Sequence, residues 1–485
     1  MATFADLPNE LISKILHQTA PSDIEALSAI STNVHLQAAR LLREHRELRK
    51  QYTILRTPAS GSDEEEGNWL AGLLMMILHN PRIALYITEL HLNFWQDSWD
   101  VLHSGHHSPA SVSRYHLSYP TDMLEQFEET TRSMELILPR EVDGWMNAIR
   151  RGDEDPIIAL LLLHLPNLRS LAYELYCQPS QHKALKTIRR IGEAKNQPRL
   201  LELKEVNLDY ESRWEHTETC DLSSAFMSIP SVQSFRTASS YPIEDEDAIK
   251  IFLQTWASNV TNLKFTGGWI RANSLCEVIK KTKYLRSLTW DAYPDYGGEG
   301  VFDYLSISES LQMNASATLE SLTLHSQRYG AIPLGSLRDL VALREISTEV
   351  AILFSSDGKD ISTWPERLPP NIEKLTLVLE DDHIMQTSEN FCAAFRCLLR
   401  SKKSLTPYLK FIAIRMNSEH HCREAYDHVQ EPCSCAGILL RHDHPDGGGH
   451  MNASCGDCSD CHDVVENFLQ ESVGPDVSDS ARSSL

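Results

Sequence analysis

The C-terminal part of the sequence holds the residues whose types and spacing are closest to known chemistry. Six of the eleven cysteines lie between Cys422 and Cys461, interspersed with histidines. Two residues separate Cys455 from Cys458, a spacing that can place two thiolates on one zinc ion, and Cys461 or His462 is near enough in sequence to add a third ligand. The ligand candidates for such a structural zinc site are Cys433, Cys435, Cys455, Cys458, Cys461 and His462.

Two interpretations of this Cys/His-rich extension, residues 418–465, remain open. In the first, zinc orders it; in the second, it is a polar extension that binds nothing specific, which Gly447-Gly448-Gly449 favours. The sequence contains no phosphate-binding loop of the Gly-x-x-x-x-Gly-Lys-Ser/Thr type and no Gly-x-Ser-x-Gly nucleophile elbow. We therefore expect a protein that is not an enzyme. A zinc-dependent enzyme centred on the extension is a further alternative, but no general base can be assigned to it.

A short apolar sequence pattern recurs through the middle of the chain, and it indicates how this part of the chain folds. Eight copies read apolar-x-x-apolar-x-apolar, and the last three residues alternate like a strand with one buried face, while weaker copies lie around Phe235 and Ile346. From Leu171 onward the copies are 24 to 37 residues apart. Their central positions are Leu90, Leu171, Val206, Phe235, Leu263, Leu288, Leu322, Ile346, Leu375 and Ile412.

Helical patterns separate these predicted strands, at residues 247–256, 273–281, 302–311 and 389–399. A strand, a loop and a helix repeated near every thirty residues are typical of a solenoid, in which neighbouring repeats bury each other's apolar faces. The alternative is an ordinary α/β domain, because buried parallel strands also read as Val-, Ile- and Leu-rich runs. Residues 96–160 carry no repeat and are predicted to be an insertion or cap.

Composition narrows the classes of partner. The formal net charge of −22 argues against a nucleic-acid or anionic-membrane binder, because both surfaces favour basic proteins. The apolar runs 69–78 and 157–163 are about half the length of a bilayer span and predict buried helices. The first residues show no basic region followed by an apolar run, so we expect an intracellular protein, cytoplasmic and/or nuclear. Its cysteines are expected to be reduced thiols or metal ligands and not disulfides.

The N-terminal residues predict three short helices. Leu7, Leu11 and Ile15 recur every fourth residue, and Ile12 and Leu16 widen the same apolar stripe. Pro21 ends this pattern. A Ser-x-x-Glu sequence, Ser22 to Glu25, predicts a capping box for a second helix that carries Ile24, Leu27 and Ile30. Ser31 is expected to cap a third helix with Val34, Ala38, Leu41, His45 and Leu48 on one face.

These N-terminal residues resemble the F-box. That motif opens with Leu-Pro-x-Glu, here Leu7-Pro8-Asn9-Glu10, and continues with an Asp-apolar pair, here Asp23-Ile24. A Val/Ile-Ser step follows at Ile30-Ser31, whereas the tryptophan often found after it is absent. The resemblance implies that the helices dock on a Skp-type adaptor and through it on a cullin. The residues that it implies for the contact, or for holding the contacting helices, are Leu7, Pro8, Leu11, Ile12, Ile15, Leu16, Ile24 and Leu27.

The copies of the recurring pattern resemble degenerate leucine-rich repeats, with Asp209, Thr266, Asp291 and His325 where that family has its turn asparagine or cysteine. The combined resemblance, to the substrate receptors of cullin-based ubiquitin ligases of filamentous fungi, implies a small three-helix F-box followed by an irregular α+β or α/β solenoid. It implies that the repeats bind an unknown target protein and that no cofactor is required. The alternative is a repeat scaffold outside any ligase. The expected segments are 1–50 for the F-box, 51–84 for an acidic loop and connecting helix, 85–417 for the repeats, 418–465 for the Cys/His-rich extension and 466–485 for a disordered tail.

Overall fold

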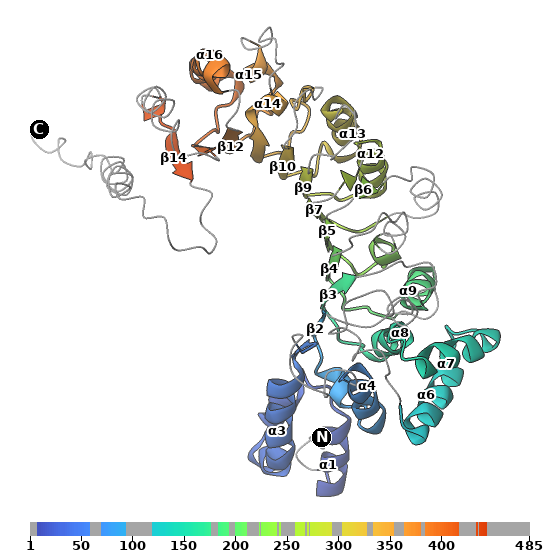
Figure 1. The fold of residues 1–485 in the computed structure, drawn as a ribbon. Coiled ribbons are helices and arrows are strands. Elements are labelled where there is room, and N and C mark those ends of the chain that lie inside the picture. The colour runs from blue at the N-terminus through green and yellow to red at the C-terminus, as the bar shows by residue number, and fades with distance from the viewer. Residues whose placement is uncertain are drawn as a thin grey trace, which may run out of the picture. The chain divides into compact units, whose positions relative to one another are not determined.

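The structure is a computed structural model, and its ribbon is drawn in Figure 1. It divides into two compact units, Met1–Leu343 and Arg344–Leu485. The described residues are 7–58, 69–93, 119–175, 183–193, 199–210, 223, 225–239, 242–243, 258–266, 269–270, 272–292, 303–326, 333–353, 363–379, 384–416, 433–434 and 436–443.

Three helices open the first unit: α1 (Asn9–Gln18), α2 (Ile24–Ser28) and α3 (Thr32–Tyr52). We call residues 7–52 the N-terminal module. The predicted cap of α3 is confirmed, because the Ser31 hydroxyl accepts a hydrogen bond from the Val34 backbone N–H at 3.3 Å. The capping box predicted for α2 is wrong: the residue before the helix is Asp23, and the Ser22 hydroxyl donates to the Asp23 carboxylate at 3.1 Å instead. Helix α2 is also shorter than expected and ends before Ile30.

Parallel strands form the body of the first unit, and all of them except β1 coincide with the recurring pattern. In spatial order they are β1 (Ile54–Arg56), β2 (Glu89–Leu92), β3 (Ser170–Leu175), β4 (Glu205–Tyr210), β5 (Ser234–Ser239), β7 (Asn262–Thr266), β9 (Ser287–Ala292) and β10 (Ser321–Ser326). The predicted central positions are register partners from strand to strand, from Leu90 through Leu171 to Leu322, and all are buried. Such a ladder stacks apolar side chains into one continuous core.

Helices of this unit lie on one side of the strands in Figure 1, where they cover the buried residues. They are α4 (Trp69–His79), α8 (Asp155–His164), α9 (Lys183–Glu193), α12 (Ala272–Lys281) and α13 (Tyr304–Ala315), with a short turn η3 (Ile83–Leu85) after α4. The two apolar runs are α4 and α8, so both predicted buried helices are confirmed. The helix expected over 247–256 lies outside the described residues. A separate pair, β6 (Pro242–Ile243) and β8 (Trp269–Ile270), is also parallel.

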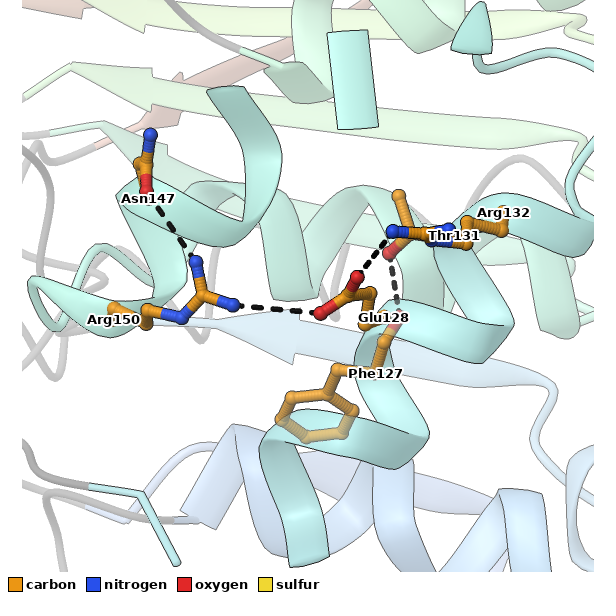
Figure 2. Close-up of polar contacts among 6 residues, drawn as sticks. All are labelled: Phe127, Glu128, Thr131, Arg132, Asn147 and Arg150. Atoms are coloured by element: carbon orange, nitrogen blue, oxygen red, sulfur yellow. Dashed lines mark hydrogen bonds and ion pairs between the residues drawn. The ribbon is translucent and has the colours of Figure 1, made fainter. Parts of the chain in front are cut away.

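The region predicted as an insertion or cap is helical where it is described, from Tyr119 on. It contains α6 (Thr121–Ser133), η6 (Pro139–Glu141), α7 (Val142–Arg150) and the start of α8. Figure 2 shows Glu128 of α6 between Arg132 of the same helix and Arg150 of α7, with 3.4 Å between Glu128 Oε2 and Arg150 Nη2. The ring of Phe127 is fully buried beside this exposed ion pair. Apolar burial therefore holds the two helices together, and the exposed ion pairs add little.

Another ion pair connects this region to α9, among the helices that cover the repeats. Arg190 of α9 donates two hydrogen bonds to the Glu141 carboxylate, at 2.6 and 2.7 Å, and a third to the Leu136 carbonyl at 2.8 Å. Both charged side chains are partly buried, and this bidentate geometry is the strong form of the Arg–carboxylate contact. The hydrogen bond from Arg190 lowers the pKa of Glu141 from 4.5 to about 2.

We expect Glu141→Gln to lower the free energy of unfolding by roughly 1–2 kcal/mol at neutral pH, because one charged hydrogen bond is lost. Since the pKa of Glu141 is depressed in the folded state, this contribution is present above pH 4.5 and is lost as the pH falls toward about 2. Urea unfolding of both proteins across this range measures it. The matched control is Glu128→Gln, whose exposed pairs predict a loss below about 1 kcal/mol. Equal losses at the two positions, or a loss at Glu141 that persists at low pH, would contradict the assignment.

The second unit repeats the pattern of strand and helix. Its strands are β11 (Glu345–Glu349), β12 (Lys374–Leu379), β13 (Phe411–Met416) and β14 (Leu439–Asp443), and its helices are α14 (Val350–Leu353), α15 (Trp364–Arg367) and α16 (Ile384–Leu405). The predicted positions Ile346, Leu375 and Ile412 are again register partners, continued by Leu440 in β14. Strand β14, like β1, was not predicted. The buried Trp364 indole donates to the Ala394 carbonyl at 3.1 Å and so joins α15 to α16.

The chain is therefore a mixed α/β protein with parallel strands in a repeating order, which confirms the predicted fold at that level. Within the described ranges, no helix has both the length and the apolar composition needed to cross a bilayer. The predicted segment boundaries remain predictions.

Candidate docking surface on the N-terminal helices

The N-terminal module has a small hydrophobic core of its own. Its buried residues are Ile12, Leu16, Ile24, Val34, Ala38, Leu41 and Leu42, with Leu7 and Leu27 partly buried against them. The eight residues proposed from the sequence thus fall into two groups. Ile12, Leu16 and Ile24 are core, and Leu7 and Leu27 border it, so these five hold the helices together. Pro8, Leu11 and Ile15 are exposed and are the members of the set that face solvent.

Helix α1 therefore presents an apolar pair to solvent. The side chains of Leu11 and Ile15 are 48% and 37% exposed, and a spacing of four residues places them on one face of the helix. Pro8 fixes the start of this helix, because its carbonyl accepts hydrogen bonds from the N–H groups of Leu11 and Ile12 at 3.0 and 3.1 Å. This exposed pair is the candidate docking surface, because leaving apolar groups in water is unfavourable and covering them contributes to binding.

Two further apolar side chains of the module are exposed, and sequence reasoning did not select them as contacts. Ile30 is 56% exposed and Leu36 is 67% exposed. Ile30 was predicted to belong to the second helix, but α2 ends at Ser28. Leu36 lies two residues from the buried Val34 on α3 and so points away from the stripe that packs inward. The position of Leu36 opposite the buried stripe of α3 could be predicted from the sequence, whereas the end of α2 could not.

Several polar contacts attach the module to the body of the first unit, and two of them involve α1 and α3 directly. The Arg82 guanidinium donates through Nη1 to the His17 carbonyl at the end of α1, at 3.0 Å. The buried His45 of α3 shares a hydrogen bond with the buried Tyr86, with 3.0 Å between Nδ1 and the phenol oxygen. These contacts fix the orientation of α1 and α3 on the segment that leads into β2. The exposed face of α1 is consequently presented from a fixed support.

Burial lowers the pKa of His45 below 6.5, although the Glu25 carboxylate, 3.8 Å from Nε2, opposes this shift. A lowered folded-state pKa means that the contribution of neutral His45 to stability is present above pH 6.5 and is lost as the pH falls below that value. We expect the midpoint temperature of thermal unfolding to fall as the pH is lowered from about 7.5 to about 5.5. It should fall less in His45→Gln, whose side chain cannot take up that proton. The same fall in both proteins would contradict this role.

Of the six predicted zinc ligands, only Cys433 belongs to the described residues. Cys433 is fully buried, and burial raises the pKa of its thiol to about 12, so a metal would have to displace a tightly held proton there. Nearby, Lys402 donates to the Ala436 carbonyl at 2.7 Å. Cys435, Cys455, Cys458, Cys461 and His462 lie outside the described residues. Among the residues that are described, no group of three His, Cys, Asp or Glu side chains is placed to hold a metal. The zinc site remains a prediction.

Comparison of the sequence with models of known protein families and with curated proteins gave no match.

Proposed function

We propose that this protein is the target-binding subunit of a cullin-based ubiquitin ligase. In this proposal the N-terminal module binds a Skp-type adaptor, which connects it to a cullin, and the repeats bind the protein to be modified. The main observation that supports this proposal is the exposed Leu11–Ile15 pair on α1, directly after the Leu7-Pro8-Asn9-Glu10 motif. The pair lies outside the hydrophobic core that the helices of the module share. An α-helix with an uncovered apolar pair and a rigid support fits a role as a docking element.

The mechanism proposed is positional. The protein makes and breaks no bond, and it binds two partners at once, so that lysines of the target are held near the site of ubiquitin transfer. Holding reactants together raises their effective concentration and removes most of the entropic cost of their encounter. The residues that contribute are those that fix the geometry. Arg82, His45 and Tyr86 hold α1 and α3 on the body, and the parallel ladder carries the target-binding surface.

Affinity purification of the full-length tagged chain from its own cells, followed by immunoblots for the adaptor and for a cullin, tests this proposal. Recovery of both proteins supports the ligase function. Recovery of neither, while other proteins are retained through the repeats, would contradict it and would favour a scaffold outside any ligase.

A further inference from the structure

The side of the parallel strands opposite the helices presents polar side chains in regular rows. On each strand, the residues directly before and after the buried central position point to the side opposite the core. Register pairing aligns these residues from one strand to the next. One row runs through Asn207 of β4, Arg236 of β5, Lys264 of β7 and Thr289 of β9. In Figure 1 the helices of this unit lie on the other side of these strands. We call this side the open face.

Two cations lie side by side near the middle of the open face. Arg236 and Lys264 are register partners on neighbouring strands, and both side chains are exposed. Neither forms an ion pair with any residue in the described part of the chain. Adjacent strands are about 4.8 Å apart, so the two like charges repel each other. An anionic group bound between them would remove that repulsion.

Carboxylates border the cation pair on both sides. Glu205 and Asp209 of β4 are exposed on the open face, one strand before Arg236. Asp291 of β9 follows Lys264 on the other side, and the charge of Lys264 acts on it. A run of several acidic residues would meet repulsion from these carboxylates, whereas a single acidic group flanked by a basic one would meet attraction at both positions.

We propose that the open face binds an extended segment of a partner protein in which an acidic and a basic side chain are separated by one residue. The acidic group would lie between Arg236 and Lys264, and the basic group over Glu205 and Asp209. The centre of the cation pair is one and a half strand spacings from β4, about 7 Å, and side chains two residues apart on an extended chain are also about 7 Å apart. This inference rests on the proposed function, because it names the class of target that the repeats recognise.

The observations favour a protein segment over a nucleic acid. A phosphate backbone carries a negative charge at every nucleotide, and successive charges would meet Glu205, Asp209 and Asp291 as well as the cation pair. The chain as a whole carries a net charge of −22, which adds to this repulsion.

The test selects a phage-displayed library of random peptides, about twelve residues long, against the full-length protein; such a peptide spans about 40 Å when extended. Arg236→Glu with Lys264→Glu reverses the cation pair. The matched control is Arg43→Glu with Arg46→Glu, an equal change of charge at exposed positions of α3. We expect selected peptides to be enriched in an acidic residue two positions from a basic one. They should bind the reversed variant at least about tenfold more weakly than wild type or control, a loss near 1.4 kcal/mol.

Selected peptides that lack this spacing, or that bind the reversed variant as well as wild type, would overturn the inference. Displacement of the peptides by single-stranded polyuridylate would overturn it as well. Circular dichroism and adaptor binding of the reversed variant should match wild type, so loss of peptide binding is not loss of the fold. If peptides bind as expected but no adaptor does, the open face keeps its assignment and the ligase function fails.

Discussion

Replacing Leu11 and Ile15 together with aspartate should abolish adaptor binding and leave the fold unchanged. Both side chains are exposed, so the two substitutions together are expected to cost the free chain no more than about 1 kcal/mol of stability. In the complex, each new carboxylate would be buried without a partner, which costs several kcal/mol and corresponds to a loss of affinity of at least about a hundredfold. Co-purification with purified adaptor, together with thermal unfolding of the free variant, measures the two quantities.

Leu36→Asp is the matched control for this experiment. Leu36 is even more exposed, but it lies on the face of α3 that points away from the core of the module. We expect this variant to bind adaptor as wild type does. Ile12→Asp and Leu16→Asp are unsuitable, because both residues are buried and their loss of binding would report unfolding. Undiminished binding by the Leu11→Asp, Ile15→Asp variant would remove α1 from the interface.

The second large effect is expected at Trp290, in the middle of the ladder of the first unit. Its side chain is fully buried between the register partners Phe265 and Leu324, and its ring lies 5.5 Å from that of Tyr304 in α13. Trp290→Ala removes these contacts and leaves a cavity between the strands and the helix. We expect a loss of about 3–5 kcal/mol in the free energy of unfolding, measured by denaturant titration with circular dichroism.

Thr289→Ala provides the control on the same strand. Its side chain alternates to the open face and is only half-buried, so the expected change is within about 0.5 kcal/mol. Similar losses at the two neighbouring positions would show that the strand does not have one buried and one open side. That result would also remove the geometric basis of the open-face inference.

The repeat ladder was predictable from the sequence because its signal is local and repeated. The positions from Leu171 to Leu322 follow one pattern, and a shift of one residue would turn every apolar side chain to the wrong face. Strand β1 escaped prediction because it has three residues and exposes Ile54. Strand β14 escaped because Leu439 and Leu440 stand next to a polar run that shows no alternation.

The sequence could not predict which residues of the apolar stripe on α1 are buried and which are exposed, for a different reason. Leu11, Ile12, Ile15 and Leu16 all belong to one wide apolar stripe, and periodicity alone does not say which half faces α3. The structure assigns Ile12 and Leu16 to the core and leaves Leu11 and Ile15 outside it. The Arg236–Lys264 pair was missed because the two residues are 28 positions apart and become neighbours only through strand pairing.

Isothermal titration of purified Skp-type adaptor into the purified full-length protein tests the central claim most directly. We predict a one-to-one complex with a dissociation constant below about 1 µM, equivalent to about −8 kcal/mol, and loss of the binding heat in the Leu11→Asp, Ile15→Asp variant. Absence of binding by the wild-type chain at concentrations up to about 100 µM, with its fold intact, would contradict the proposed ligase function.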